Sequence, residues 1–194
     1  MRKWLLKQFE WYRGLILRLK TRRGFLFYKD KDMQLYEKYV TETVDENTGR
    51  LTKIDFHIPD DFNFGFDVVD FWGKNTPDKT ALLWVGEHHE EKTFTFSDMM
   101  RLTNKTANYF RSLGIKKGDR VMLILRRHYQ FWFSIVALHK IGAIVIPATD
   151  QLMKKDLVYR FNLAGVSAVV ISSTGSIVDE AEKAFEQCDV KTKI

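Results

Sequence analysis

The second half of the chain alternates short apolar runs with longer stretches of helical period, and this alternation restricts the fold more than any other feature. The order is a strand at 120–125, a helix at 130–141, a strand at 143–146, a helix at 156–163, a strand at 167–171 and a helix at 177–187. A helix that joins two such strands packs its apolar face back on the sheet, so this order is typical of parallel strands. The sequence therefore predicts an α/β fold with a mostly parallel open sheet and crossover helices.

Two further strands and a helix are predicted ahead of this region. Residues 80–85 (TALLWV) predict a buried strand, and residues 92–96 (KTFTF) alternate with period two, as a half-buried strand does. Ser97 is the predicted N-cap of a helix that ends near Leu113, and Asp98 suits its positive end. The inner stripe of this helix is predicted to consist of Leu102, Thr106, Tyr109 and Leu113.

The N-terminal arm, residues 1–23, is basic and amphipathic. It holds eight Lys and Arg residues against one Glu, a net charge of +7, whereas the whole chain carries +6. An apolar stripe of helical spacing is formed by Leu5, Phe9, Tyr12, Ile16 and Leu19. The pattern predicts a basic amphipathic helix. Such a helix lies on an anionic membrane surface, or it docks on its own protein or on a partner.

Composition and charge narrow the function classes. Apolar residues make up 45% of the chain and aromatic residues 14%, which excludes a disordered protein. Because the positive charge is confined to the arm, no nucleic-acid partner is expected. The single cysteine, Cys188, forms neither an internal disulfide nor a thiolate metal site. Together with the lack of a secretory signal pattern, this predicts a cytoplasmic protein.

Three polar clusters are candidates for chemistry. Residues 172–176 (SSTGS) pass from a strand to a helix and can present N–H groups to a phosphate, but a plain turn with Ser176 as N-cap is the favoured interpretation. His88 and His89 are expected in a solvated hairpin loop rather than at a metal. Residues 126–128 (RRH) follow a strand, so they either meet a phosphate or form an exposed turn. No catalytic and no metal-ligating residue is predicted.

Six segments resemble, in order and spacing, the motifs of acetyl- and medium-chain acyl-CoA synthetases, which are AMP-forming members of the adenylate-forming superfamily. The segments are 62–72 (FNFGFDVVDFW), 77–82 (PDKTAL), 93–98 (TFTFSD), 113–121 (LGIKKGDRV), 140–149 (KIGAIVIPAT) and 156–162 (DLVYRFN). Each motif alone is modest, but their common order makes the resemblance specific. The resemblance does not cover the N-terminal arm.

This resemblance implies the N-terminal part of the large domain of an adenylate-forming enzyme. The implied organisation is an extension at 1–28, a lead-in segment at 29–61 and an incomplete N-terminal subdomain of the AMP-binding (adenylation) domain at 62–194. The family's Ser/Thr/Gly-rich phosphate loop ending in Pro-Lys, its ribose-binding Asp and its catalytic Lys have no counterpart in the 194 residues. The implied function is a fragment of an ATP-dependent acid–CoA ligase that is inactive without its remaining C-terminal part. The alternative is a CoA-binding, nucleotide-binding or interaction module that another chain completes.

The resemblance also implies cofactors and site residues. The family uses ATP, Mg²⁺ and CoA to convert an acid into acyl-CoA, AMP and pyrophosphate in fatty acid metabolism. In relatives the segment after the PAT motif lies beside the CoA nucleotide, which implies Gln151 and Arg160 and, less directly, Arg127 as binding residues. Arg160 has an alternative partner in Asp156, four residues earlier on the predicted helix. Arg126 stands where the family usually has a proline. The turn that contains Arg127 therefore differs from the family pattern.

Overall fold

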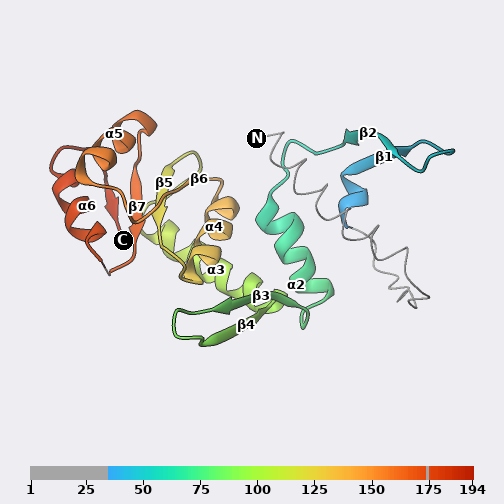
Figure 1. Ribbon diagram of the computed structural model, residues 1–194, viewed down its shortest axis with the longest axis horizontal. Coiled ribbons are helices and arrows are strands. Elements are labelled where there is room, and N and C mark those ends of the chain that lie inside the picture. Colours follow the sequence, from blue (N-terminus) through green and yellow to red (C-terminus); the bar gives the residue numbers. More distant parts are fainter. Residues whose placement is uncertain (1–34, 174) are drawn as a thin grey trace. The chain divides into compact units, whose positions relative to one another are not determined.

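The computed structural model describes residues 35–173 and 175–194 and divides into two compact units, with the boundary between His57 and Ile58 (Figure 1). The basic helix expected at 1–23 lies outside the described residues. Within the two described ranges, no helix has both the length and the apolar character that a bilayer crossing requires.

The first unit contains a β-hairpin. After the short 3-10 helix η1 (Leu35–Lys38), β1 (Val40–Val44) pairs antiparallel with β2 (Leu51–Phe56). In the turn, the Thr48 hydroxyl and the backbone N–H groups of Thr48 and Asn47 donate to the carboxylate of Asp45. These hydrogen bonds lower the pKa of Asp45 and fix the turn geometry.

The second unit is built on a four-stranded parallel sheet with the strand order β6-β5-β7-β8. The strands are β5 (Arg120–Ile124), β6 (Ile144–Pro147), β7 (Ala168–Ile171) and β8 (Thr192–Lys193). The predicted parallel sheet is confirmed, and its first three strands lie within one residue of their predicted positions.

Helices cover both faces of this sheet (Figure 1). Val121 and Leu123 of β5, and Leu125 just after it, pack with α3 and α4. Met122 and Ile124 of β5 pack with α5 and α6. Successive side chains of a strand point to opposite faces of the sheet. A strand that is buried on both faces therefore needs apolar residues at every position, without polar alternation. The helices are α3 (Phe96–Ser112), α4 (Gln130–Ile141), α5 (Lys154–Ala164) and α6 (Ile177–Phe185).

A helical segment and a second hairpin precede the sheet. They consist of the π-helical η2 (Phe64–Asp70), α2 (Phe71–Asn75), β3 (Thr80–Val85) and β4 (Glu91–Thr95). The prediction that β3 is buried is wrong, because it belongs to a two-stranded sheet and leaves Leu83 and Val85 56% and 51% exposed. The prediction that residues 143–146 form a buried strand is wrong for a similar reason: β6 is an edge strand with Ile144 exposed.

The start of α3 differs from the prediction. Thr95, rather than Ser97, is the N-cap, because its Oγ1 accepts the N–H of Asp98 while Asp98 Oδ2 accepts the N–H of Thr95, both at 3.2 Å. This reciprocal pair is a capping box, which satisfies two N–H groups at the helix start. The N–H of Thr95 and the side chain of Arg101 lower the pKa of Asp98.

The buried stripe of α3 also differs from the prediction. The predicted stripe is rotated from the observed one by about 85° around the helix axis. Leu102 and Thr106 are half-buried, and Tyr109 and Leu113 are exposed. The buried residues are Met99, Thr103, Ala107 and Phe110.

Candidate functional site

The carboxyl ends of β5, β6 and β7 meet at one edge of the parallel sheet. Arg127 follows β5, Gln151 follows β6 and Ser172 follows β7. The backbone N–H of Ser172 donates to the carbonyl of Ile124 at 3.0 Å, so these strand ends lie side by side. Ligands of open α/β sheets gather at this kind of edge, which makes it the candidate site.

An ion pair joins the loops after β5 and β6. Arg126 Nε lies 2.8 Å from Asp150 Oδ2, and both side chains are partly exposed. A pair of this kind contributes about 0–1 kcal/mol, so it adds little stability but shows that the two loops are in contact. Arg127 and Gln151 come directly after the two paired residues in the chain. The sequence analysis did not identify Asp150.

The β3–β4 hairpin fixes the main chain beside Arg127. Trp84 Nε1–H donates to the Arg127 carbonyl at 2.6 Å, and the Trp84 ring packs edge-on against Tyr129 with the ring centroids 5.3 Å apart. Lys92 Nζ donates to the Tyr129 hydroxyl at 3.2 Å and lies 4.5 Å from the centre of its ring. The side chain of Arg127 remains exposed, and no ion pair among the described residues includes it.

Arg160 lies away from this edge, on α5. It is six residues after the helix start at Lys154, which is about 9 Å along the axis. Its alternative partner Asp156 instead accepts the N–H of Met153 at 3.3 Å, and Arg160 takes part in no ion pair among the described residues. The structure therefore places Arg127 and Gln151 in two loops at the same edge of the sheet, and Arg160 on the exposed surface of α5.

The serine-rich segment lies at the same edge. Ser172 Oγ is buried and has no hydrogen-bond partner among the described residues, whereas Ser173 is exposed. Ser176 occupies the N-cap position of α6, as predicted, but its side chain makes no capping hydrogen bond. At the start of α5, the N–H of Lys154 already has an acceptor within the protein, because it donates to Glu180 Oε2 at 2.7 Å. That hydrogen bond, helped by Lys183, lowers the pKa of Glu180.

A buried cation was missed by the sequence analysis. Lys140 Nζ donates to Asp70 Oδ1 at 2.6 Å, to Thr103 Oγ1 at 2.8 Å and to Asn104 Oδ1 at 2.7 Å. The cluster ties η2, α3 and α4 together, and burial lowers the pKa of Lys140 in spite of the neighbouring carboxylate. Two sequence features could have indicated this buried pair. One is a lysine near the end of a strongly apolar helical run, and the other is an aspartate within an apolar segment.

The remaining titratable candidates are not arranged for catalysis. His88 and His89 lie in the turn between β3 and β4, as predicted. Cys188 is half-buried, and burial raises the pKa of its thiol, which disfavours the reactive thiolate. Within residues 35–173 and 175–194, no three His, Cys, Asp or Glu side chains are grouped closely enough to hold a metal ion.

Comparison with known proteins extends this description. The family model named "AMP-binding enzyme" matches residues 69–194. The chain is 36% identical over 148 residues to acyl-coenzyme A synthetase ACSM1 of Mus musculus, a match that covers 72% of this chain and 25% of that protein. It is also 36% identical over 121 residues to ACSM5 of Rattus norvegicus, with 59% and 21% covered. Both relatives are named as mitochondrial proteins, and the chain spans about a quarter of their length.

Solved structures show the same fold. The fatty acyl CoA synthetase of Mycobacterium tuberculosis superposes with a TM-score of 0.60 at 22% identity, covering 68% of this chain and 26% of that one. A long-chain-fatty-acid-CoA ligase of Archaeoglobus fulgidus gives a TM-score of 0.63 at 18% identity, with 72% and 28% covered. The chain therefore belongs to the AMP-binding enzyme family and corresponds to the N-terminal portion of an AMP-forming acyl-CoA synthetase.

Proposed function

We propose that this chain is the N-terminal part of an ATP-dependent acid–CoA ligase, which converts an acid, ATP and CoA into acyl-CoA, AMP and pyrophosphate. The observation that carries the proposal is the family match over residues 69–194, together with similarity to proteins named acyl-CoA synthetases. The proposed organisation is an extension at 1–28, a lead-in segment at 29–61 and an incomplete N-terminal adenylation subdomain at 62–194.

The proposed role of the carboxyl edge is to hold the nucleotide end of CoA. Arg127 offers a guanidinium group to a phosphate, and Gln151 offers an amide that donates and accepts hydrogen bonds. Both side chains are exposed, while Arg126 is already paired with Asp150. Arg160 is proposed as a more distant phosphate contact, because it lies farther along α5.

The proposed reaction needs groups that these 194 residues do not contain. The CoA thiolate would displace AMP from an acyl adenylate, and magnesium would offset the charge of the ATP phosphates. We assign no magnesium ligand in this chain, because the described residues hold no suitable cluster. The sequence also has no Ser/Thr/Gly-rich loop ending in Pro-Lys. We therefore propose that the chain binds CoA and does not complete the reaction by itself.

Two measurements test this proposal. Pyrophosphate release from ATP, Mg²⁺ and a panel of short to medium acids is expected to stay at background with the 194-residue chain. Calorimetric titration with CoA is expected to show binding that Arg127→Gln weakens about tenfold, the cost of one charge-assisted hydrogen bond. The matched control is Lys105→Gln, which removes an exposed cation of α3 far from Arg127 in the sequence. Turnover by the chain, or equal CoA binding by both variants, contradicts the proposal.

The proposed compartment is the cytoplasm, and residues 1–23 are proposed to contact a membrane surface. The relatives are named as mitochondrial, so imaging of the tagged chain distinguishes the two compartments. Pelleting of the whole chain with anionic and neutral liposomes tests the membrane contact, because a basic helix binds the anionic surface more strongly.

A further inference from the structure

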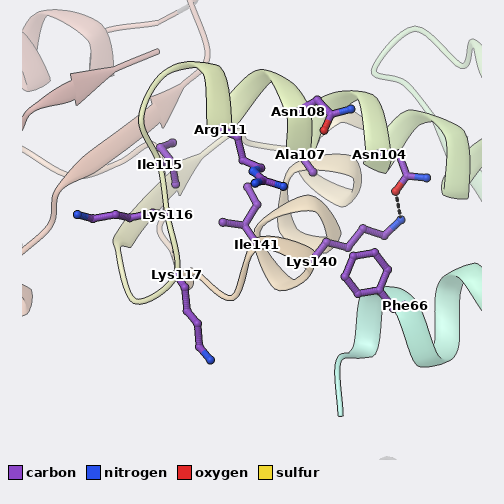
Figure 2. A pocket seen from close by; sticks show the side chains of 10 residues that line it. All are labelled: Phe66, Asn104, Ala107, Asn108, Arg111, Ile115, Lys116, Lys117, Lys140 and Ile141. Atoms are coloured by element: carbon purple, nitrogen blue, oxygen red, sulfur yellow. Dashed lines mark hydrogen bonds between the residues drawn. The ribbon is translucent and has the colours of Figure 1, made fainter. Parts of the chain in front are cut away.

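A cavity of about 630 Å³ opens at the amino edge of the sheet (Figure 2). Arg127 and Gln151 follow the carboxyl ends of strands, at the opposite edge. The turn before β5 forms one wall, and the backbone N–H of Gly118 donates to the carbonyl of Gly142, which fixes this turn to the end of α4. The other walls come from α3, α4 and η2. The residues that line the cavity are Phe66, Asn104, Ala107, Asn108, Arg111, Ile115, Lys116, Lys117, Lys140 and Ile141.

The charge at this cavity is positive. Arg111, Lys116 and Lys117 take part in no ion pair among the described residues, and no carboxylate belongs to the lining. The ammonium group of Lys140 is already held by Asp70. The ends of α3 and α4 also face this region, and each helix end carries about half a negative charge. The carboxylate of Asp119, just beyond the lining, accepts the N–H of Lys116 at 2.9 Å and offsets one of the three cations. The two carboxyl-terminal helix ends together offset about one more, so a net charge of about +1 remains for an anion.

The cavity also offers amide and apolar groups. Asn104 Oδ1 accepts from Lys140, which leaves its NH₂ group to donate elsewhere. Phe66 is 51% exposed, and Ile141 also lines the cavity. Figure 2 shows Arg111 reaching towards Ile141, while Lys116 and Lys117 extend from the rim in two other directions, away from Arg111. A volume of this size suits a small organic molecule and exceeds the needs of a bare phosphate ion.

We propose that this cavity binds a small soluble organic phosphate. Its phosphate group binds Arg111 at the rim, where the exposed side chains of Lys116 and Lys117 add positive charge, and its carbon part contacts Phe66 and Ile141. The site is separate from the proposed CoA edge and does not depend on the proposed ligase activity.

The test uses phenyl phosphate and inorganic phosphate as probes of the isotope-labelled 194-residue chain. In amide NMR titrations, phenyl phosphate is expected to shift the signals of the 115–118 turn and the side-chain signals of Arg111, Asn104 and Asn108. Inorganic phosphate is expected to bind more weakly, and added salt is expected to weaken both. The signals of Gln151 and Ser172 report the carboxyl edge and are expected to stay in place.

Matched triple variants separate a built site from general attraction to positive charge. The test variant R111Q/K116Q/K117Q is expected to raise the Kd for phenyl phosphate by at least about tenfold. The control variant K105Q/K155Q/K191Q removes the same charge from exposed positions outside the cavity and is expected to leave Kd within about twofold. Circular dichroism checks that both variants fold. The proposal is overturned if both variants weaken binding equally, if inorganic phosphate binds as tightly, or if the shifts fall on Gln151 and Ser172.

Discussion

The buried pair of Asp70 and Lys140 gives the sharpest stability prediction. Its two side chains are 8% and 2% exposed, and Lys140 Nζ lies 2.6 Å from Asp70 Oδ1. Asp70→Asn keeps the shape but leaves the ammonium group without its counter-charge. Removing one partner of a buried ion pair costs about 3–5 kcal/mol. Because Thr103 and Asn104 still accept hydrogen bonds from Nζ, we expect the lower end, about 3 kcal/mol.

The assay is unfolding by urea and by heat, followed by circular dichroism. For a chain of this size, a loss of 3 kcal/mol lowers Tm by about 6–12 °C. The matched control is Arg101→Gln, which breaks the exposed pair with Asp98 and is expected to cost less than about 1 kcal/mol. The reasoning is refuted if Asp70→Asn costs no more than this control.

A double-mutant cycle checks that the cost arises from the pair itself. Lys140→Met leaves the Asp70 carboxylate buried without a donor, whereas the double variant with Asp70→Asn removes both charges. We expect the double variant to be more stable than the sum of the single effects predicts, with a coupling of about 1–3 kcal/mol. Additive costs would mean that the two side chains do not interact.

Three further variants test other parts of the second unit. Thr95→Ala removes one half of the capping box and is expected to cost about 1 kcal/mol in urea unfolding, whereas Thr95→Ser retains the cap and is expected to cost little. Ser172→Ala removes a buried hydroxyl that has no partner among the described residues, so we expect unchanged or slightly higher stability; a loss above about 1 kcal/mol would reveal a partner. Burial lowers the pKa of His139 below its usual 6.5. As the pH falls, His139 is therefore protonated in the unfolded chain before it is protonated in the folded chain, so the free energy of unfolding decreases. His139→Gln is therefore expected to reduce the loss of stability between pH 7.5 and pH 5.5, and an unchanged slope in urea midpoints would contradict this.

The order of elements could be predicted from the sequence because each strand is a short apolar run bounded by polar or glycine residues. The predicted helix at 130–141 matches α4, and it ends at Gly142, which has a φ of +79° that favours glycine. Burial was harder to predict. The run at 80–85 is as apolar as a core strand, but it pairs with one neighbour only, and sequence composition does not report the number of neighbouring strands.

The orientation of α3 and the details of the site could not be predicted for a similar reason. Leu102 and Tyr109 are apolar enough to mark a core face, yet tertiary packing selects the stripe that carries Met99 and Phe110. The resemblance pointed to the carboxyl edge, but the residue that pairs with Asp150 there, Arg126, has a left-handed backbone with a φ of +46°. A positive φ at a residue other than glycine is set by the surrounding structure rather than by the residue type.

The contact between Asp70 and Lys140 also imposes an order on folding during synthesis. The two residues are 70 positions apart in the chain. At a synthesis rate of 5–20 residues per second, the ammonium group follows its carboxylate by roughly 4–14 s. An unpaired carboxylate resists burial, so η2 is expected to stay in water during that interval while the β3–β4 hairpin forms. Pulsed amide exchange on stalled ribosomes would detect this as protection of Val69 that begins only after α4 has emerged.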